Sequence, residues 1–148
     1  MAEPGFTVRP FAPHDTEAVV ALWRACDLTR PWNDPYRDIA RKLAVQPELF
    51  LVALAGDSLV GTVMAGYDGH RGWINYLAVD PSQRRRGLGR LLMARAEAML
   101  AARGCAKINL QVREGNGEVA AFYRAIGFTV DPVTSFGKRL LDDSPGED

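Results

Sequence analysis

A glycine-bearing, arginine-rich loop carries the clearest chemistry of this 148-residue sequence. Residues 80–92 read Asp-Pro-Ser-Gln-Arg-Arg-Arg-Gly-Leu-Gly-Arg-Leu-Leu and follow an apolar run that ends at Val79. The first N–H groups of a helix that begins near Gly87 lack backbone partners and carry partial positive charge, so they attract anions. Glycine lets the backbone approach a ligand, and guanidinium groups match phosphate oxygens. The pattern predicts a pyrophosphate-binding site.

Other interpretations of the loop compete with this one. It lacks the Gly-Lys-Ser/Thr ending of a Walker A motif, and Leu92 stands where the dinucleotide-binding fingerprint requires a third glycine or alanine. Two glycines before a helix are also compatible with ordinary turn chemistry, and an arginine triplet with a solvated patch. Nucleic-acid binding is disfavoured because 18 basic and 18 acidic residues give a formal net charge of zero, and no aromatic residues are interleaved with the arginines.

A second segment contains Asn116, Tyr123 and Gly127-Phe128. With Arg84-x-x-Gly87-x-Gly89 after an apolar strand, it resembles the two motifs of the GNAT (Gcn5-related) N-acetyltransferase superfamily. Two motifs in this order and at this separation are much more specific than either alone. Residues 30–35 and 67–72 are most similar to the bacterial YpeA-type acetyltransferases, so the resemblance spans nearly the whole chain.

The resemblance implies an acyltransferase that moves an acetyl group from acetyl-CoA to a primary amine by direct attack in a ternary complex. The acceptor would be a small molecule or a protein N-terminus. Tyr123 would be the general acid that protonates the departing thiolate, and the backbone of Leu77 and Val79 would pair with the pantetheine arm on a splayed strand. The implied cofactor-binding residues are Leu77, Ala78, Val79, Arg84, Arg85, Arg86, Gly87, Leu88, Gly89, Arg90, Asn116 and Tyr123.

The general base is not identified. The positions nearest to those where family members carry a Glu or His hold Trp73, Asn75 and Gln111, none of which accepts a proton near neutral pH. Three interpretations stay open at this point. The acceptor presents an already neutral α-amine, the chain is a non-catalytic acyl-CoA-binding module, or a water chain leads to a titratable residue. The candidates for the end of that chain are Asp34, His70 and Glu114.

The resemblance also implies an acceptor site between residues 30–35 and 68–72. Trp32, Asn33, Asp34 and Trp73 would supply it with an aromatic wall and a carboxylate. Such a wall suits an amine held by cation–π and charge contacts. The alternative is that the two tryptophans pack in the core, while Asn33-Asp34 caps a helix.

Apolar periodicity predicts the elements that position these groups. Strands are expected at 7–10, 49–54, 59–67, 73–79, 107–112, 128–130 and 136–140, and helices near 15–26, 35–45, 87–103 and 117–126. This order predicts an α/β fold of the GNAT type, with a mixed central sheet and about four flanking helices. Its N-terminal strands would be antiparallel, and the cofactor helix would make a parallel crossover. We expect one domain at 1–141 and a disordered acidic tail at 142–148.

Cysteine content and hydropathy indicate where the protein works. Cys26 and Cys105 form neither a metal motif nor a disulfide framework, so free thiols in a reducing cytosol are expected. The N-terminus has no apolar signal region, and no apolar run is long enough to cross a bilayer. We therefore expect a cytoplasmic enzyme with an amine substrate and no metal, membrane or nucleic-acid partner. A homodimer is left open.

Overall fold

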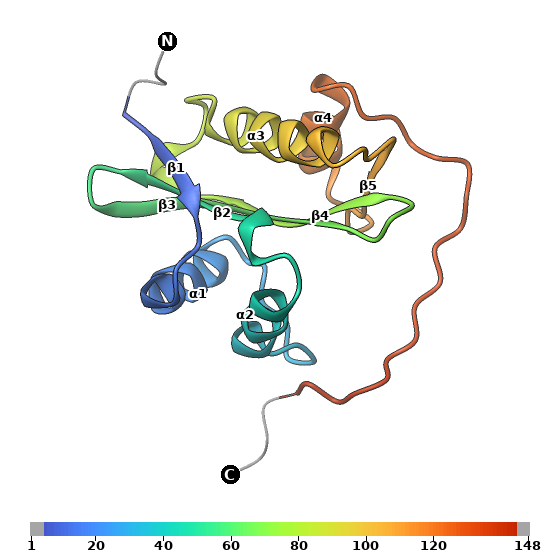
Figure 1. Ribbon diagram of the computed structural model, residues 1–148, viewed down its shortest axis with the longest axis horizontal. Helices are drawn as coiled ribbons and strands as arrows, with labels where there is room; N and C mark the ends of the chain where they lie inside the picture. The colour runs from blue at the N-terminus through green and yellow to red at the C-terminus, as the bar shows by residue number, and fades with distance from the viewer. Residues whose placement is uncertain (1–4, 145–148) are drawn as a thin grey trace.

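A five-stranded sheet divides the part of the chain that the computed structural model describes, residues 5–144, into two helical layers (Figure 1). Its strands lie in chain order, and each is antiparallel to the next except for β4 and β5, which are parallel. The strands are β1 (Thr7–Pro10), β2 (Phe50–Ala55), β3 (Ser58–Tyr67), β4 (Gly72–Val79) and β5 (Ile108–Leu110). The mixed sheet expected from the sequence is confirmed.

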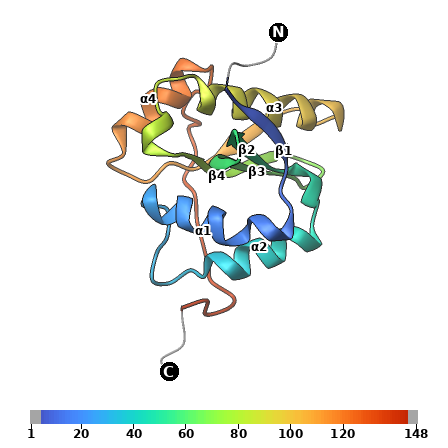
Figure 2. The ribbon, with the colours of Figure 1, turned by 90° about the vertical axis from the view of Figure 1, so that its left-hand side faces the viewer.

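Two helices cover each face of the sheet (Figure 2). Helices α1 (Thr16–Ala25) and α2 (Pro35–Ala44) lie on one face, and α3 (Leu88–Ala102) and α4 (Gly117–Ala125) lie on the other. Helix α3 connects β4 to β5 and makes the predicted parallel crossover. Short 3₁₀ turns at Pro13–Asp15, Pro47–Leu49 and Pro81–Gln83 precede α1, β2 and the α3 loop. Within residues 5–144 no helix is both long and apolar enough to span a membrane.

The core has two halves because both faces of the sheet are covered. Successive side chains of a strand point to opposite faces. Phe50 and Val52 of β2 therefore pack with α1, while Leu51 and Ala53 pack in the cluster that contains α3. Such a doubly covered strand reads as a continuous apolar run rather than as an alternating pattern.

Two expectations about helix ends have different outcomes. The Asp34 carboxylate accepts a hydrogen bond from the Tyr36 N–H at 2.9 Å, so Asp34 caps α2 as the sequence indicates. An aspartate ahead of an apolar helical stripe also predicts a cap of α1 by Asp15, and this prediction is wrong. Its carboxylate instead accepts two hydrogen bonds from Arg9, at 2.7 and 2.9 Å, and one from the Ala12 N–H at 2.8 Å.

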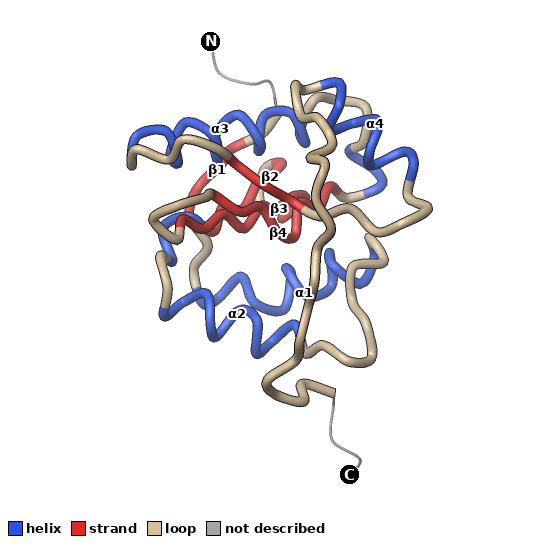
Figure 3. Tube along the Cα trace, turned by 90° about the vertical axis from the view of Figure 1, so that its right-hand side faces the viewer, coloured by secondary structure: helices blue, strands red, loops and turns tan. Residues whose placement is uncertain are grey.

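The C-terminal segment, residues 128–144, departs furthest from the prediction. The strands expected at 128–130 and 136–140 are absent, and the chain runs in an extended path from α4 past the open side of the sheet to α2 (Figures 1 and 3). The segment contacts the β5 region through side chains rather than through a backbone ladder. Asp131 accepts hydrogen bonds from Lys107 and Asn109. An apolar pattern becomes a strand only where a neighbouring backbone edge pairs with it.

The far end of the segment is fixed to α2. Arg41 donates two hydrogen bonds of 2.6 Å to the Asp143 carboxylate, and Arg37 donates one of 3.4 Å. Asp143 is buried although it falls in the expected disordered tail. The described chain therefore continues three residues past the expected domain end, to Ser144, and the remainder of that tail, 145–148, lies outside the described residues.

Candidate active site

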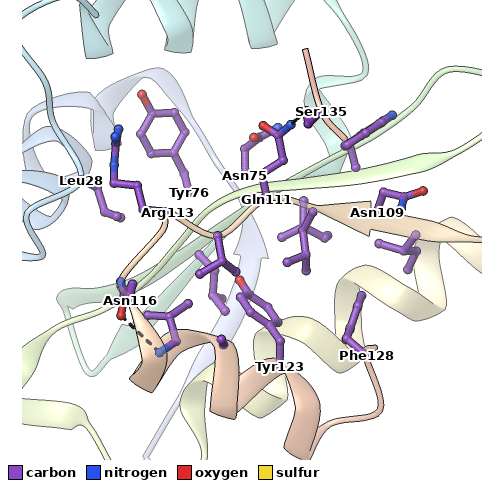
Figure 4. A pocket seen from close by; sticks show the side chains of 18 of the residues that line it. Leu28, Asn75, Tyr76, Asn109, Gln111, Arg113, Asn116, Tyr123, Phe128 and Ser135 are labelled. Atoms are coloured by element: carbon purple, nitrogen blue, oxygen red, sulfur yellow. Dashed lines mark hydrogen bonds between the residues drawn. The ribbon is translucent and has the colours of Figure 1, made fainter. Parts of the chain in front are cut away.

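A cavity of about 1980 Å³ opens where β4 and β5 separate (Figure 4). The two strands pair only between Gly72–Ile74 and Ile108–Leu110. Beyond Ile74, β4 continues to Val79 without a strand partner on that side among residues 5–144. The Val79 carbonyl accepts from Arg84 and Cys26. The other backbone groups on that side of the strand are available to a ligand, because buried polar groups of the main chain require a partner. Residues of α4 and of the C-terminal segment line the opposite side.

A bulge in β4 accompanies this separation. Thr62 of β3 lies opposite Ala78, but Met64 lies opposite Asn75, so β4 carries one extra residue at this place. Tyr76, in the extra stretch, has a left-handed φ of +52°. A bulge bends a strand and increases its local twist. The bend coincides with the point where β4 leaves β5.

The predicted anion-binding corner lies where β4 leads into α3. Gly87 has a φ of +81° and Arg85 a φ of +65°, so the backbone turns sharply before the helix. In the described chain, the N–H groups of residues 85–90 donate to no protein acceptor. These unpaired groups at the start of a 15-residue helix fit a phosphate group.

Packing against α4 also requires a glycine at position 89, in addition to the access that glycine gives a ligand to the backbone. A Cβ at this position would lie 3.3 Å from the Phe122 ring and 3.8 Å from Val79. Close packing of α3 on α4 therefore demands the small residue. Leu88 is buried in the core, so only its backbone is available to a ligand.

The arginines of the corner differ in their partners. Arg84 Nε donates to the Val79 carbonyl at 3.3 Å, and Arg86 Nη1 donates to Gln83 at 2.7 Å. Arg85 and Arg90 have no hydrogen-bond or carboxylate partner among the described residues. Of the implied cofactor-binding residues, those that line the cavity itself are Leu77, Ala78, Val79, Arg84, Asn116 and Tyr123. Residues 85–90 lie beyond its lining.

Asn116 and Tyr123 bring α4 to the cavity. Asn116 Oδ1 accepts from the Val119 N–H at 3.3 Å, so this side chain caps α4 and also borders the cavity. Tyr123 packs edge-on against Phe122 and Phe128, and its hydroxyl points into the cavity without a protein partner in the described chain (Figure 4). Burial raises the pKa of Tyr123 to about 12. The phenol therefore carries its proton at neutral pH.

The three candidate bases separate in space. Glu114 lines the cavity. Asp34 is engaged at the start of α2, and His70 lies exposed in the turn between β3 and β4, so neither borders the cavity. A water chain that ends on a carboxylate is therefore compatible with Glu114 alone among the three.

The expected acceptor residues are partly brought together. Trp32, Asn33 and Trp73 line the cavity, whereas Asp34 does not. Neither tryptophan packs in the core, because Trp32 is 46% exposed and Trp73 is 39% exposed. The Arg113 guanidinium lies 5.7 Å from the Trp32 ring, which links the loop before α2 to the loop before α4.

Asp38, a carboxylate of α2 that lines the cavity, was not singled out from the sequence. It accepts hydrogen bonds of 2.5 Å from both the Tyr76 hydroxyl and the Asn33 amide. One signal was available, because Asp38 lies one turn after Asp34 and hence on the same side of α2. No signal in the sequence indicated the contact of Asp38 with Tyr76, which is 38 residues away.

Known proteins resemble this chain over nearly its whole length. The family model described as "Acetyltransferase (GNAT) family" matches residues 17–128. An acetyltransferase of Pectobacterium atrosepticum is 53% identical over 137 residues, which cover 92% of this chain and 96% of that protein. The narrower similarity to YpeA-type acetyltransferases stays a prediction.

Solved structures agree with the family match. The structure of Ard1 from Thermoplasma volcanium superimposes with a TM-score of 0.75 at 29% identity, over 86% of this chain and 84% of that one. Naa20 of Chaetomium thermophilum, in complex with a bisubstrate analogue, superimposes with a TM-score of 0.68 at 29% identity, over 84% and 71%. The overall fold is thus shared with solved structures that also match in sequence. The chain belongs to the GNAT family of acetyltransferases and is an acyltransferase.

Proposed function

We propose that the protein transfers an acetyl group from acetyl-CoA to a primary amine, on a small molecule or a protein N-terminus, by direct attack in a ternary complex. One observation carries this proposal. The unpaired edge of β4 forms a continuous path from the α3 corner to the cavity that holds the Tyr123 hydroxyl. Aminolysis of acetyl-CoA needs a site for the pyrophosphate, a backbone edge that holds the pantetheine arm, and a proton donor beside the sulfur. The corner, the edge of β4 and Tyr123 follow one another in the same order as these parts of the coenzyme.

The residues present fit the coenzyme. The free N–H groups of residues 85–90 suit its pyrophosphate, with Arg85 and Arg90 available for further charge contacts. The backbone of Leu77 and Val79 suits the amides of the pantetheine arm, which would add to β4 as a further strand adds to a sheet edge. Asn116 retains its amide N–H₂ group for the same arm, because only its oxygen serves the helix cap.

The reaction needs a proton at one atom and the loss of a proton at another. The amine nitrogen attacks the thioester carbonyl, the carbon–sulfur bond breaks, and the sulfur leaves with the electron pair. Tyr123 Oη donates the proton that neutralises this sulfur, because burial keeps the phenol protonated. The nitrogen releases one of its protons to solvent water as the amide forms, and solvent returns a proton to Tyr123.

The acceptor must bind as a neutral amine. An α-amine has an ordinary pKa of about 8 and a lysine side chain one of about 10.4, so the α-amine loses its proton far more readily. Glu114, through water, is the base candidate that borders the cavity. A terminal α-amine is therefore the acceptor that depends least on a general base in this site.

The comparison with Naa20 supports direct attack. That structure holds a bisubstrate analogue, a ligand that joins donor and acceptor in one molecule. In the present chain one cavity is lined by both the cofactor strand and the acceptor loop, so it accommodates two substrates at once. A covalent acyl-enzyme is not required.

The test combines binding with turnover. Calorimetric titration with CoA should show saturable binding, and thiol release from acetyl-CoA should depend on the amine supplied. The amines are a peptide with a free N-terminus, the same peptide with a blocked N-terminus and an internal lysine, a free amino acid and a polyamine. Absence of CoA binding contradicts the proposal. Binding without turnover on any amine would favour a non-catalytic acyl-CoA-binding module.

A further inference from the structure

A polar network lies inside the core directly behind the bulge of β4. Thr62 Oγ1 donates to the Tyr76 carbonyl at 2.8 Å and accepts from Trp23 Nε1 at 3.0 Å. Trp23 and Thr62 are fully buried, and neither lines the cavity. The Thr62 hydroxyl thus uses its one proton on the carbonyl of the bulged residue and its oxygen on the indole.

Tyr76 is also held at its side chain. Its ring stacks on Trp23 with centroids 3.7 Å apart and planes 10° from parallel. Its hydroxyl donates to Asp38 of α2. The carbonyl, ring and hydroxyl of this one residue are therefore each fixed by a different element: β3, α1 and α2.

Packing alone does not explain these polar groups. A valine has nearly the shape of threonine, and an apolar residue at position 62 would spare the core a buried hydroxyl. A buried, fully satisfied polar network instead specifies one arrangement of the backbone among several. A left-handed, non-glycine residue such as Tyr76 persists only where its surroundings over-determine it.

We propose that Thr62, together with Trp23, is a positioning residue for coenzyme binding. The two side chains hold Tyr76 in the left-handed conformation and so keep the edge of β4 from Leu77 to Val79 separated from β5. The inference rests on the proposed function, because it assigns that edge to the pantetheine arm. Without the hydroxyl, the position of the extra residue in β4 is no longer fixed, so the strand can shift its register. A shift of one residue turns every side chain of a strand to the opposite face.

The test compares two substitutions at one position. Thr62→Val keeps the shape but removes the hydroxyl, and it should weaken CoA binding about tenfold, the effect of one buried hydrogen bond. The rate at saturating acetyl-CoA should change much less than KM for acetyl-CoA. Thr62→Ser keeps the hydroxyl and should restore the affinity, which a purely steric role would not predict.

A matched control separates positioning from general destabilisation. Phe11→Leu loosens the same half of the core at its stack on Phe50, without contacting Thr62, Trp23 or Tyr76, so it lowers the melting temperature but should leave the CoA dissociation constant unchanged. If Thr62→Val does not fold, Thr62→Ala takes its place in the comparison with Thr62→Ser. The alanine removes the same hydroxyl and leaves more space around the side chain.

The outcomes distinguish this inference from the proposed function. A wild-type chain that does not bind CoA contradicts the proposed function itself. If the wild type binds CoA and a folded variant without the Thr62 hydroxyl binds it with equal affinity, only the positioning role is overturned. Equal weakening by Phe11→Leu would also overturn it, because the loss of CoA affinity would then follow stability rather than the bulge.

Discussion

The β4 wall of the cavity and the C-terminal segment opposite differ in what holds them in place. Behind β4 stand fully buried side chains, among them Trp23, Thr62 and Val63. The C-terminal segment is fixed mainly by two aspartates, Asp131 and Asp143, and several of its apolar side chains face solvent. A wall set by core packing is rigid, whereas one held by a few polar contacts opens at low cost. We infer that the coenzyme side is preformed and that the acceptor side adjusts to its ligand.

The largest effect is expected from filling the corner on the rigid side. Gly89→Trp must displace Phe122, because even a Cβ at this position lies 3.3 Å from that ring, and CoA binding should become undetectable by calorimetry. Gly137→Trp makes the same change in the C-terminal segment, where no atom lies within 4 Å of an added Cβ. That control should bind CoA as the wild type does. Equal binding by both variants would remove the corner from the site.

Removal of the Tyr123 hydroxyl tests chemistry on the same preformed side. Tyr123→Phe should lower turnover about 10²-fold with CoA affinity nearly kept, because a positioned general acid contributes roughly that much. The pKa of Tyr123 is raised from 10.0 to about 12 by burial, so its ionisation should not limit turnover at pH 10.0. A pH–rate profile of both proteins checks the two statements. Unchanged turnover would exclude Tyr123 as the acid.

Release of the C-terminal segment should affect the acceptor rather than the coenzyme. Asp143→Asn weakens the hydrogen bonds from Arg41 and Arg37, so KM for the amine should rise severalfold while the CoA dissociation constant stays unchanged. Trypsin should also cut faster after Lys138 and Arg139. Asp142→Asn is the matched control, because within residues 5–144 that carboxylate bonds only the nearby Ser144. A changed CoA affinity would mean that the two walls are coupled.

Acid should mimic this release. The Arg41 guanidinium holds the pKa of Asp143 below its ordinary value of 3.8. A lowered folded-state pKa means that the contact stabilises above pH 3.8 and is lost as the pH falls through the lowered value. Pepsin digestion of the wild type at decreasing pH should therefore cut residues 132–141 before the sheet unfolds. Simultaneous loss of both regions would contradict the proposed difference between the walls.

The smallest effect is expected at the exposed apolar side chains of the segment. Phe136 is 93% exposed, so Phe136→Ser should change the free energy of unfolding by no more than about 0.5 kcal/mol. Leu92→Ala, in the fully buried cluster under α3, should cost about 2–5 kcal/mol. Urea unfolding of the two variants measures both. A loss at Phe136 that approaches the loss at Leu92 would show that the segment packs in solution.

Part of the site was readable from the sequence because it is local. The end of β4, the turn and the start of α3 follow one another within residues 75–92, and apolar periodicity with glycine and proline signals is sufficient to place them. The cap of α2 by Asp34 was predicted for the same reason, since cap and helix are neighbours. Asp15 shows the limit of this reasoning, because its carboxylate is engaged instead by Arg9 of the preceding strand.

Strand prediction failed where no backbone edge was available. Residues 128–130 and 136–140 have a strand-like pattern, yet β5 contacts this segment through the side chains of Lys107 and Asn109. A pattern of apolar residues states what a segment prefers. It does not state whether a partner edge remains unoccupied at the right place.

The sequence by itself determined the family motifs, the order of helices and strands down to α4, and the place of the glycine-bearing loop before α3, because these depend on residues close together in the chain. Tertiary structure alone decided the contacts between distant residues. It placed Trp23 beside Thr62, 39 residues away, brought Asp38 to Tyr76, and joined Arg41 to Asp143 across 102 residues. Such pairs form only when the sheet has closed the long loops between them, and no local pattern records which partners will meet.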